Sequence, residues 1–245
     1  MLETKVAFIT GGAKRIGAAL AHKLHAVGMN LAINYNKSET AARALQAELN
    51  NKRPNSVILV QGNVLDTTKL SDMIQQIIDT YERLDVLINN ASTFYPTSVG
   101  QVTESEWEDL FGTNLKAPFF LSQAAAPYLK TSQGCIINLV DIHGKRPKPS
   151  YPVYSSAKAG LIMLTKALAL ELAPNIRVNG IAPGTILWPE ENIDETSKQE
   201  IMAKVALERH GTPEDIAKIA LFLIRDAQYI TGQIIPVDGG RSLNQ

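Results

Sequence analysis

The 245-residue chain has a single cysteine, no excess of either charge and no long hydrophobic run, and we expect it to have no signal peptide. One cysteine, Cys135, excludes an internal disulfide, and with no signal peptide this favours a reducing cytosol. Cys135 stands in an apolar run, where we expect a thiol to belong to the core rather than to act as a nucleophile. No run approaches the roughly 18 apolar residues that a membrane helix needs. We therefore predict a cytoplasmic protein without a membrane partner.

Positive and negative side chains balance, with 24 Lys and Arg against 24 Asp and Glu. A net charge of zero removes the electrostatic argument for a nucleic acid or an anionic surface as partner. Hydrophobic residues make up 45% and charged residues 20% of the chain, which are ordinary globular proportions and do not suit disorder. The function must be sought in motifs, and none of them predicts a metal site.

Short β-rich runs alternate with longer amphipathic stretches, and no repeat, linker or low-complexity tract interrupts them. This alternation predicts a mostly parallel sheet with helices on both faces, in one α/β domain over residues 1–245. Runs without strict alternation, such as Val86-Leu87-Ile88, suit strands buried on both sides. The predicted strands are Val6–Thr10, Asn30–Tyr35, Ser56–Gln61, Val86–Asn89, Gly134–Val140, Arg177–Ile181 and Ile234–Val237. The helical stretches include Gly17–Val27, Glu39–Asn50, Thr68–Tyr81 and Glu104–Lys130.

The least regular segment is Thr185–Ser197, which follows Pro183-Gly184, is rich in polar residues and contains Pro189. Such a segment is typical of a mobile loop over a site, so we expect a substrate loop at about 185–200. Trp188 in this loop either covers the pocket or packs under the loop.

A glycine-containing turn, Thr10–Gly17, follows the first predicted strand and leads directly into a helix. Glycines allow a tight turn and a close approach to a pyrophosphate, and the helix start offers free N–H groups. The context between strand and helix favours a dinucleotide site over a plain turn. The residues expected to bind the cofactor here are Gly11, Arg15, Ile16 and Gly17.

The second strand ends in Tyr35-Asn36-Lys37-Ser38, without the acidic residue that usually holds the ribose 2′-hydroxyl of NAD. Lys37 and Ser38, with Arg15, could surround a 2′-phosphate with charge and donors, unless they are merely solvent-exposed loop residues. We therefore predict NADPH/NADP+ as cofactor. Asn63-Val64 follows the third strand and could border the adenine.

Tyr154 and Lys158 are four residues apart at the start of a helical pattern that runs to about Leu172, so they share one helix face. A free tyrosine, with a pKa near 10, exchanges protons poorly at neutral pH. A nearby ammonium lowers that pKa, and the tyrosine becomes useful in proton transfer. An isolated match of this kind would be no more than an exposed, polar helix start.

Six features together resemble the short-chain dehydrogenase/reductase family in order and spacing. The resemblance covers essentially the whole chain and implies a seven-stranded Rossmann-like, doubly wound parallel sheet, a nicotinamide cofactor and usually a homotetramer. It implies that Tyr154 donates a proton, that Lys158 lowers the pKa of Tyr154 and holds the nicotinamide ribose, and that Asn114 stabilises the active-site backbone and a water. The six features are Thr10–Gly17, Asn89-Asn90-Ala91, Asn114, Tyr154–Lys158, Pro183-Gly184 and Tyr229–Gly240.

Two positions depart from the usual family pattern. Arg15 replaces the middle glycine of the first motif, and Asp141 replaces the serine thirteen residues before the tyrosine. An ionised aspartate cannot donate to a carbonyl oxygen, but it suits a substrate with N–H groups or a proton relay to a ring nitrogen. The alternative is that Asp141 merely caps a loop.

Both departures occur together in the pteridine reductases, a branch that this chain resembles at Thr10–Gly17, at 35–38 and at 90–97. In that branch the pterin lies between the nicotinamide and an aromatic side chain, which Phe94 matches here unless it belongs to the core. The residue matching Ser92 contacts cofactor phosphate and pterin, and the residue matching Arg15 touches both. The resemblance thus implies that Arg15, Ser92, Phe94, Asp141 and Tyr154 bind substrate.

The predicted reaction is hydride transfer from NADPH to a C=N bond of an oxidised or dihydro pterin or a dihydrofolate-like substrate, which yields the tetrahydro form. One alternative is a carbonyl reductase of the 3-ketoacyl or sugar type, against which Asp141 speaks. Another is a non-catalytic dinucleotide-sensing protein, which would have no need of Asn114, Tyr154 and Lys158.

Overall fold

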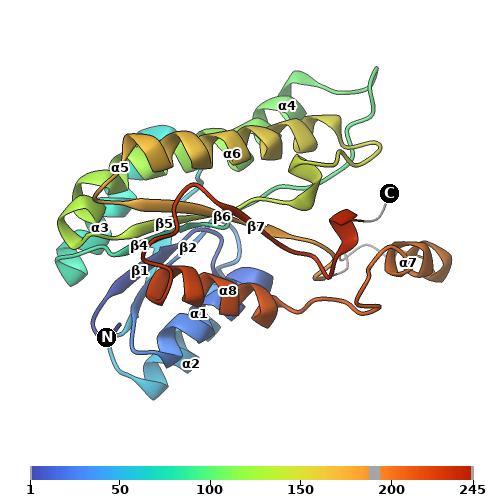
Figure 1. Cartoon of the computed structure of the whole chain (residues 1–245). Coiled ribbons are helices and arrows are strands. Elements are labelled where there is room, and N and C mark those ends of the chain that lie inside the picture. Colours follow the sequence, from blue (N-terminus) through green and yellow to red (C-terminus); the bar gives the residue numbers. More distant parts are fainter. Residues whose placement is uncertain (1, 188–193, 244–245) are drawn as a thin grey trace.

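The computed structural model of the chain describes residues 2–187 and 194–243. Seven parallel strands form one sheet in the order β3-β2-β1-β4-β5-β6-β7, which confirms the predicted Rossmann-like sheet (Figure 1). All seven predicted strands exist, with ends that differ by no more than two residues. The strands are β1 (Val6–Ile9), β2 (Asn30–Tyr35), β3 (Val57–Gln61), β4 (Val86–Asn89), β5 (Cys135–Leu139), β6 (Arg177–Pro183) and β7 (Ile234–Val237).

Helices cover both faces of the sheet, as Figure 1 shows. One layer holds α1 (Arg15–Ala26), α2 (Glu39–Lys52) and α8 (Pro213–Arg225). The opposite layer holds α3 (Leu70–Tyr81), α4 (Glu104–Phe111), α5 (Ala117–Ser132) and α6 (Pro152–Glu171).

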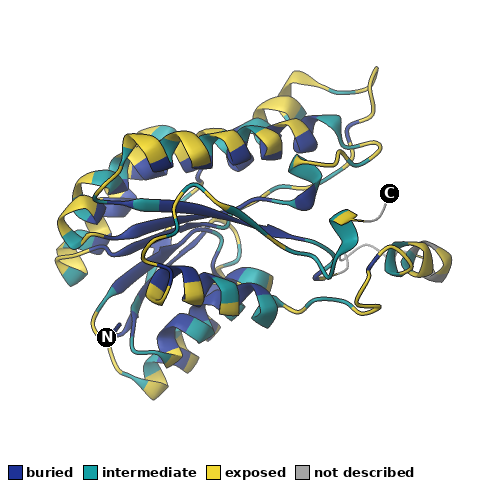
Figure 2. Ribbon diagram, in the orientation of Figure 1, coloured by how far each residue is buried: buried dark blue, intermediate teal, exposed yellow. Residues whose placement is uncertain are grey.

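The central strands are buried on both sides because each face meets a helical layer. In β4, Val86 and Ile88 belong to the core cluster with α1 and α8, whereas Leu87 belongs to the cluster with α3 and α5. Burial of alternate residues on opposite faces explains the continuous apolar run in the sequence. Figure 2 shows the strands in the colour of buried residues and the outer helix faces in that of exposed ones. Cys135, in β5, lies in this core as predicted.

The stretch 104–130 was predicted as one helical pattern, and the structure interrupts it. Thr103 and Glu106 form a capping box that begins α4, and a π-helical segment, Gly112–Lys116, separates α4 from α5. A π-segment of this kind inserts an extra residue into the helix and often marks a functional position.

The irregular segment predicted at 185–197 ends earlier in the structure than in the prediction. Helix α7 (Glu195–Met202) begins inside it, because the residues that follow Asp194 include good helix formers such as Lys198 and Gln199. Residues 188–193, which include Trp188, lie outside the described residues. The expected substrate loop is therefore at least partly helical over 195–200.

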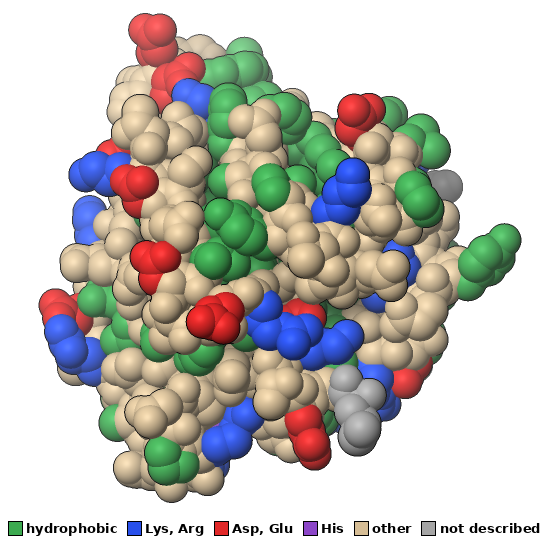
Figure 3. All heavy atoms as spheres, turned by 90° about the vertical axis from the view of Figure 1, so that its left-hand side faces the viewer, with side chains coloured by type: hydrophobic (Ala, Val, Ile, Leu, Met, Phe, Trp, Pro, Cys, Tyr) green, Lys and Arg blue, Asp and Glu red, His purple; other side chains and the backbone are tan. Residues whose placement is uncertain are grey.

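The face of the molecule in Figure 3 carries Lys and Arg side chains interspersed with Asp and Glu, without a large field of one sign. Within residues 2–187 and 194–243, no helix is both long and apolar enough to cross a membrane.

Candidate active site

The site begins where the strand order reverses. Strands β1 and β4 are neighbours, while β2 and β3 extend the sheet on one side and β5 to β7 on the other. A crevice at the carboxyl ends of the strands forms at such a point. Asn90 follows β4, and its side-chain amide donates to the carbonyl oxygens of Thr10 (2.9 Å) and Gly11 (3.0 Å), which follow β1. The two edges of the crevice are thus tied together.

The glycine turn forms a backbone cradle that side chains would fill. Gly11 has φ +58°, and a Cβ on Gly17 would stand 2.5 Å from the Gly11 carbonyl oxygen. Arg15 also has a positive φ, +53°, although it is not glycine. Arg15 therefore adopts a backbone conformation that suits glycine, at a cost that is about 1–2 kcal/mol for a non-glycine residue. The cradle fits a dinucleotide phosphate.

A cavity of about 660 Å³ continues from this turn. Its size is in the range of small-molecule sites. Most of the predicted cofactor residues line it, and they come from four separate segments of the chain. Their role in binding remains a prediction. These lining residues are Gly11, Arg15, Ile16, Gly17, Tyr35, Asn36, Lys37, Ser38, Asn63, Val64, Asn90, Ala91 and Ser92.

Four predicted cofactor residues do not line this cavity. Tyr154 and Lys158 are on α6. Pro183 ends β6, and Gly184 lies against β7, where its amide donates to the Val237 carbonyl oxygen at 3.0 Å. Gly184 has no room for a side chain, because a Cβ would stand 2.6 Å from the Cα of Asp238.

Tyr154 and Asp141 are hydrogen bonded to each other. The Tyr154 hydroxyl donates to Oδ2 of Asp141 at 2.9 Å, and Oδ1 of Asp141 accepts from the amide of His143 at 2.8 Å. Asp141 therefore caps the short 3₁₀ turn Ile142–Gly144, which was the alternative to a role in the site. In addition, it contacts Tyr154.

Lys158 lies one helical turn after Tyr154 but does not contact its hydroxyl group. Its Nζ donates to the Leu139 carbonyl oxygen at 2.9 Å and stands 5.7 Å from the centroid of the Tyr154 ring. Burial lowers the pKa of Lys158 to about 8, a shift that the Asp141 charge partly opposes.

The expected lowering of the tyrosine pKa is wrong for this structure. Burial raises the pKa of Tyr154 well above its usual value, and the Asp141 carboxylate raises it further. Desolvation and a neighbouring anion both disfavour the phenolate, and here they outweigh the opposing effect of the Ser92 side chain on the pKa of Tyr154. Tyr154 therefore keeps its proton at neutral pH.

Asn114 lies in the π-helical segment and is completely buried. Its amide donates to the carbonyl oxygens of Leu110 (2.9 Å) and Thr93 (3.0 Å), and its Oδ1 accepts from Ser92 at 2.7 Å. Asn114 thus fixes the segment that carries Ser92 into the cavity, and its part in the reaction stays a prediction.

Phe94 is 40% exposed, so it does not belong to the core. Its ring stacks on Tyr151 with centroids 4.6 Å apart and meets Tyr154 edge-on at 4.8 Å. One ring face is thus covered by Tyr151, and a planar ligand could stack only on the other face.

Three residues that lie near Phe94 or within electrostatic range of Asp141 were not predicted from the sequence. Tyr151 could have been found, because it is one helical turn before Tyr154. Lys148 stands over the rings of Tyr151 and Phe94, and Arg241 follows the final glycine pair. No periodicity links these two cations to the site, since loops bring them there.

A family model described as Enoyl-(Acyl carrier protein) reductase matches residues 11–242. The 3-oxoacyl-[acyl-carrier-protein] reductase FabG of Staphylococcus aureus is 38% identical over 244 residues, which cover 98% of this chain and 99% of that protein. The 3-oxoacyl-[acyl-carrier-protein] reductase of Synechocystis sp. is 37% identical, with 98% and 97% covered. Pteridine reductase 1 of Leishmania tarentolae is 35% identical, with 98% and 97% covered. In overall similarity these relatives support the 3-ketoacyl alternative better than the pterin prediction.

Proposed function

Since this chain belongs to the short-chain dehydrogenase/reductase family, whose members are nicotinamide-dependent oxidoreductases, we propose that it reduces a C=N bond of a pterin with NADPH. The observation that carries the pterin proposal is the hydrogen bond from Tyr154 to Asp141 at 2.9 Å. A carboxylate at this place accepts N–H groups, which a pterin ring and its amino substituent offer and a 3-oxoacyl chain does not.

The cofactor would be held by the backbone turn at Gly11–Gly17 and by the cavity that follows it. Lys37 and Ser38 line the cavity at the end of β2 and, with Arg15, suit the 2′-phosphate of NADPH. When bound, the cofactor supplies a hydride, and the protein supplies orientation and electrostatics.

The proton would come through Tyr154. Its raised pKa keeps the hydroxyl protonated at neutral pH, so it can donate to the ring nitrogen of a C=N bond as hydride reaches the carbon. The Asp141 carboxylate, freed from the tyrosine proton, can then accept an N–H of the ring or return a proton from solvent. The exposed face of Phe94 offers a stacking surface for the ring.

Reduction of a 3-oxoacyl thioester is the second candidate, because the 3-oxoacyl reductases are the more similar relatives. In that reaction Tyr154 would donate to a carbonyl oxygen. An ionised Asp141 can only accept hydrogen bonds, whereas the carbonyl oxygen of a 3-oxoacyl thioester needs a donor at this position. The site is therefore less suited to this second reaction.

One assay separates the two candidates. NADPH oxidation would be followed with dihydrobiopterin, dihydromonapterin, dihydrofolate, folate and a 3-oxoacyl thioester, and NADH would be compared with NADPH. We expect turnover of at least one pterin and a preference for NADPH. Turnover of the thioester alone would overturn the pterin proposal, and equal kcat/KM with both cofactors would overturn the assignment of Lys37 and Ser38.

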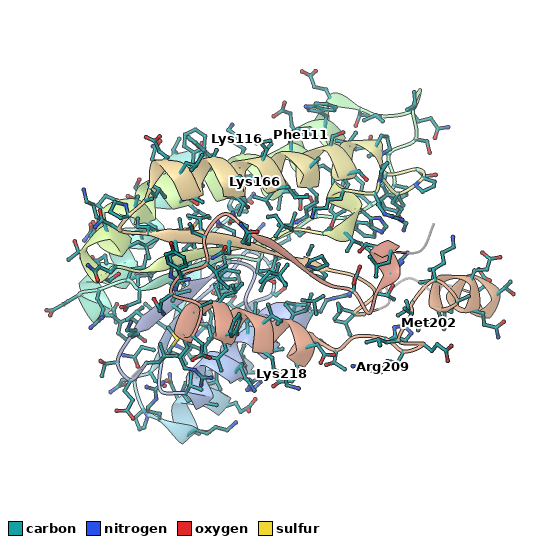
Figure 4. The ribbon with its side chains drawn as sticks, in the orientation of Figure 1. Phe111, Lys116, Lys166, Met202, Arg209 and Lys218 are labelled. Carbon is teal, nitrogen blue, oxygen red and sulfur yellow. The ribbon has the colours of Figure 1, made fainter. Side chains whose placement is uncertain are left out.

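We also propose that the layer of α4, α5 and α6 takes part in self-association, because members of this family are usually homotetramers. Trp107 (45% exposed), Phe119 and Met163 (63% exposed) present apolar surface on these three helices. Figure 4 places Phe111, Lys116 and Lys166 on the same layer. Apolar surface of this kind on a folded protein commonly marks an interface.

A further inference from the structure

Two half-buried cations lie within electrostatic range of the Asp141 carboxylate and have no role in the proposed reaction. Lys148 lies in the loop between Asp141 and α6, and Arg241 begins the 3₁₀ turn Arg241–Leu243 that follows β7. The two residues are 93 positions apart in sequence, yet the Asp141 charge raises the pKa of both. The pKa of Lys148 is nevertheless lowered, mainly by burial and secondly by the Arg241 charge.

Lys148 is positioned on the aromatic stack that the ring would use. Its Nζ is 4.0 Å from the centroid of Tyr151 and 5.0 Å from that of Phe94. Aromatic faces attract a cation but do not neutralise it. The charge of Lys148 therefore lies at the border of the surface on which a planar substrate would stack.

Arg241 is held in place by a built turn. Its Nη1 donates to Oγ1 of Thr185 at 2.6 Å, directly after β6. The turn is fixed by Asp238, whose oxygens accept from the amides of Gly240 (3.0 Å) and Ser242 (2.8 Å). Gly239 and Gly240 both have positive φ, which permits this sharp turn.

Nearby carboxylates do not pair with these cations. Within residues 2–187 and 194–243, neither Lys148 nor Arg241 has a carboxylate oxygen within 4.0 Å. Both oxygens of Asp141 are already hydrogen bonded to Tyr154 and to the amide of His143. The Thr185 hydroxyl and the aromatic rings contact these two cations but do not neutralise them. A half-buried charge without a counter-charge is costly, and a bound anion would lower that cost.

We propose that Lys148 and Arg241 form a subsite for an anionic group, a carboxylate or a phosphate, on the part of the substrate that projects beyond the reacting ring. The subsite rests on the proposed function, since it needs a substrate held at Tyr154 and Phe94. It deepens that function by selecting substrates with a negatively charged substituent over neutral ones.

The test compares charged and neutral substrates in the same variants. Dihydrofolate carries carboxylates, dihydroneopterin monophosphate carries a phosphate, and dihydrobiopterin carries neither. Loss of a charge-assisted contact should raise KM for the matching charged substrate about tenfold or more in Lys148→Gln and in Arg241→Gln. KM for dihydrobiopterin should stay within about twofold. The charged substrate whose KM rises in the variants shows whether the subsite binds a carboxylate or a phosphate.

Two controls accompany these variants. Lys145→Gln removes an exposed charge from the same loop and should change neither KM. Lys148→Arg keeps the charge and should restore most of the preference for the charged substrate. Melting temperatures would identify any variant that fails to fold. In that case the wild type alone is measured at rising salt, which should weaken its preference for the charged over the neutral substrate.

The outcomes separate the subsite from the proposed function. Equal effects on charged and neutral substrates, or none on the charged ones, would overturn the subsite. If the wild type reduces no pterin, the proposed function fails. The same comparison then uses a 3-oxoacyl coenzyme A, which carries phosphates, and the neutral N-acetylcysteamine thioester, and an equal response of these two would overturn the subsite.

Discussion

At the scale of single residues, the chemistry depends on Asp141 standing where the family usually has serine. Asp141→Ser should lower pterin kcat/KM by about 10²-fold or more, because a hydroxyl cannot accept N–H groups and relay a proton as a carboxylate does. Reduction of a carbonyl substrate should be unchanged or faster, since serine can donate to its oxygen. Steady-state kinetics with both substrates would measure the change. An Asp141→Ser protein that reduces pterins at the wild-type rate would remove Asp141 from the mechanism.

Lys158 should set the alkaline limit of activity. Its pKa, lowered by burial to about 8, means that the ammonium is lost as pH rises through that value, whereas Tyr154 stays protonated because its own pKa is raised. We expect kcat/KM to fall about tenfold per pH unit above about pH 8. Since Asp141 raises the pKa of Lys158, Asp141→Ser should move this limb to lower pH. A pH profile that is flat to pH 10 would contradict the assignment.

Arg15 combines a strained backbone with a position in the cofactor cavity. Arg15→Gly removes a strain of about 1–2 kcal/mol but adds about 0.5–1 kcal/mol of chain entropy to the unfolded state. The free energy of unfolding should therefore rise by no more than about 1.5 kcal/mol, as urea titration without cofactor would show. KM for NADPH should rise about tenfold with the lost charge. A more stable variant with unchanged KM would mean that Arg15 does not contact the cofactor.

The sequence proposed some of these site residues and missed others. Tyr154 and Lys158 were proposed from their four-residue spacing, and Asp141 from the family resemblance, which has a serine at that position. The tyrosine pKa was predicted in the wrong direction, because desolvation depends on burial that spacing does not show. Lys148 and Arg241 could not be found, since only the packing of two loops brings them to Asp141.

At the scale of elements, the π-helical segment links the helical layer to the site. Asn114→Ala would leave the Ser92 hydroxyl and two carbonyl oxygens without their partner, which should cost about 2–3 kcal/mol of unfolding free energy. Because Ser92 is released, kcat should also fall by about tenfold or more. Urea unfolding and kcat at saturating substrates would be measured together. Full activity in a destabilised variant would restrict Asn114 to a structural role.

Element existence was predicted more reliably than element detail. Strands such as β2 and β4 were correct to the residue, because apolar runs buried on both faces leave little choice of boundary. The π-segment at Gly112–Lys116 was missed, since amphipathic periodicity continues across one extra residue. The start of α7 was missed because polar residues and Pro189 dominate that stretch of sequence.

At the scale of the whole molecule, the proposed self-association can be tested on the α4–α6 layer. Placing charges there with Trp107→Asp and Met163→Asp should disrupt an apolar interface, because a buried unpaired charge is strongly unfavourable. Sedimentation velocity should then show a smaller species than the wild type. Val99→Asp, at an exposed apolar residue outside these helices, is the matched control. A wild type that sediments as a monomer would contradict the proposal.

The pairing of β1 with β4 has a consequence for folding kinetics. Ala7 is in register with Val86, so the crevice between these strands exists only after a loop of nearly 80 residues has closed. Contacts of such long range form late, after local helices, and slow the folding of parallel sheets. On refolding from urea, the far-ultraviolet circular dichroism of the helices should therefore recover before cofactor fluorescence enhancement does. The catalytic crevice would be among the last parts of the molecule to form.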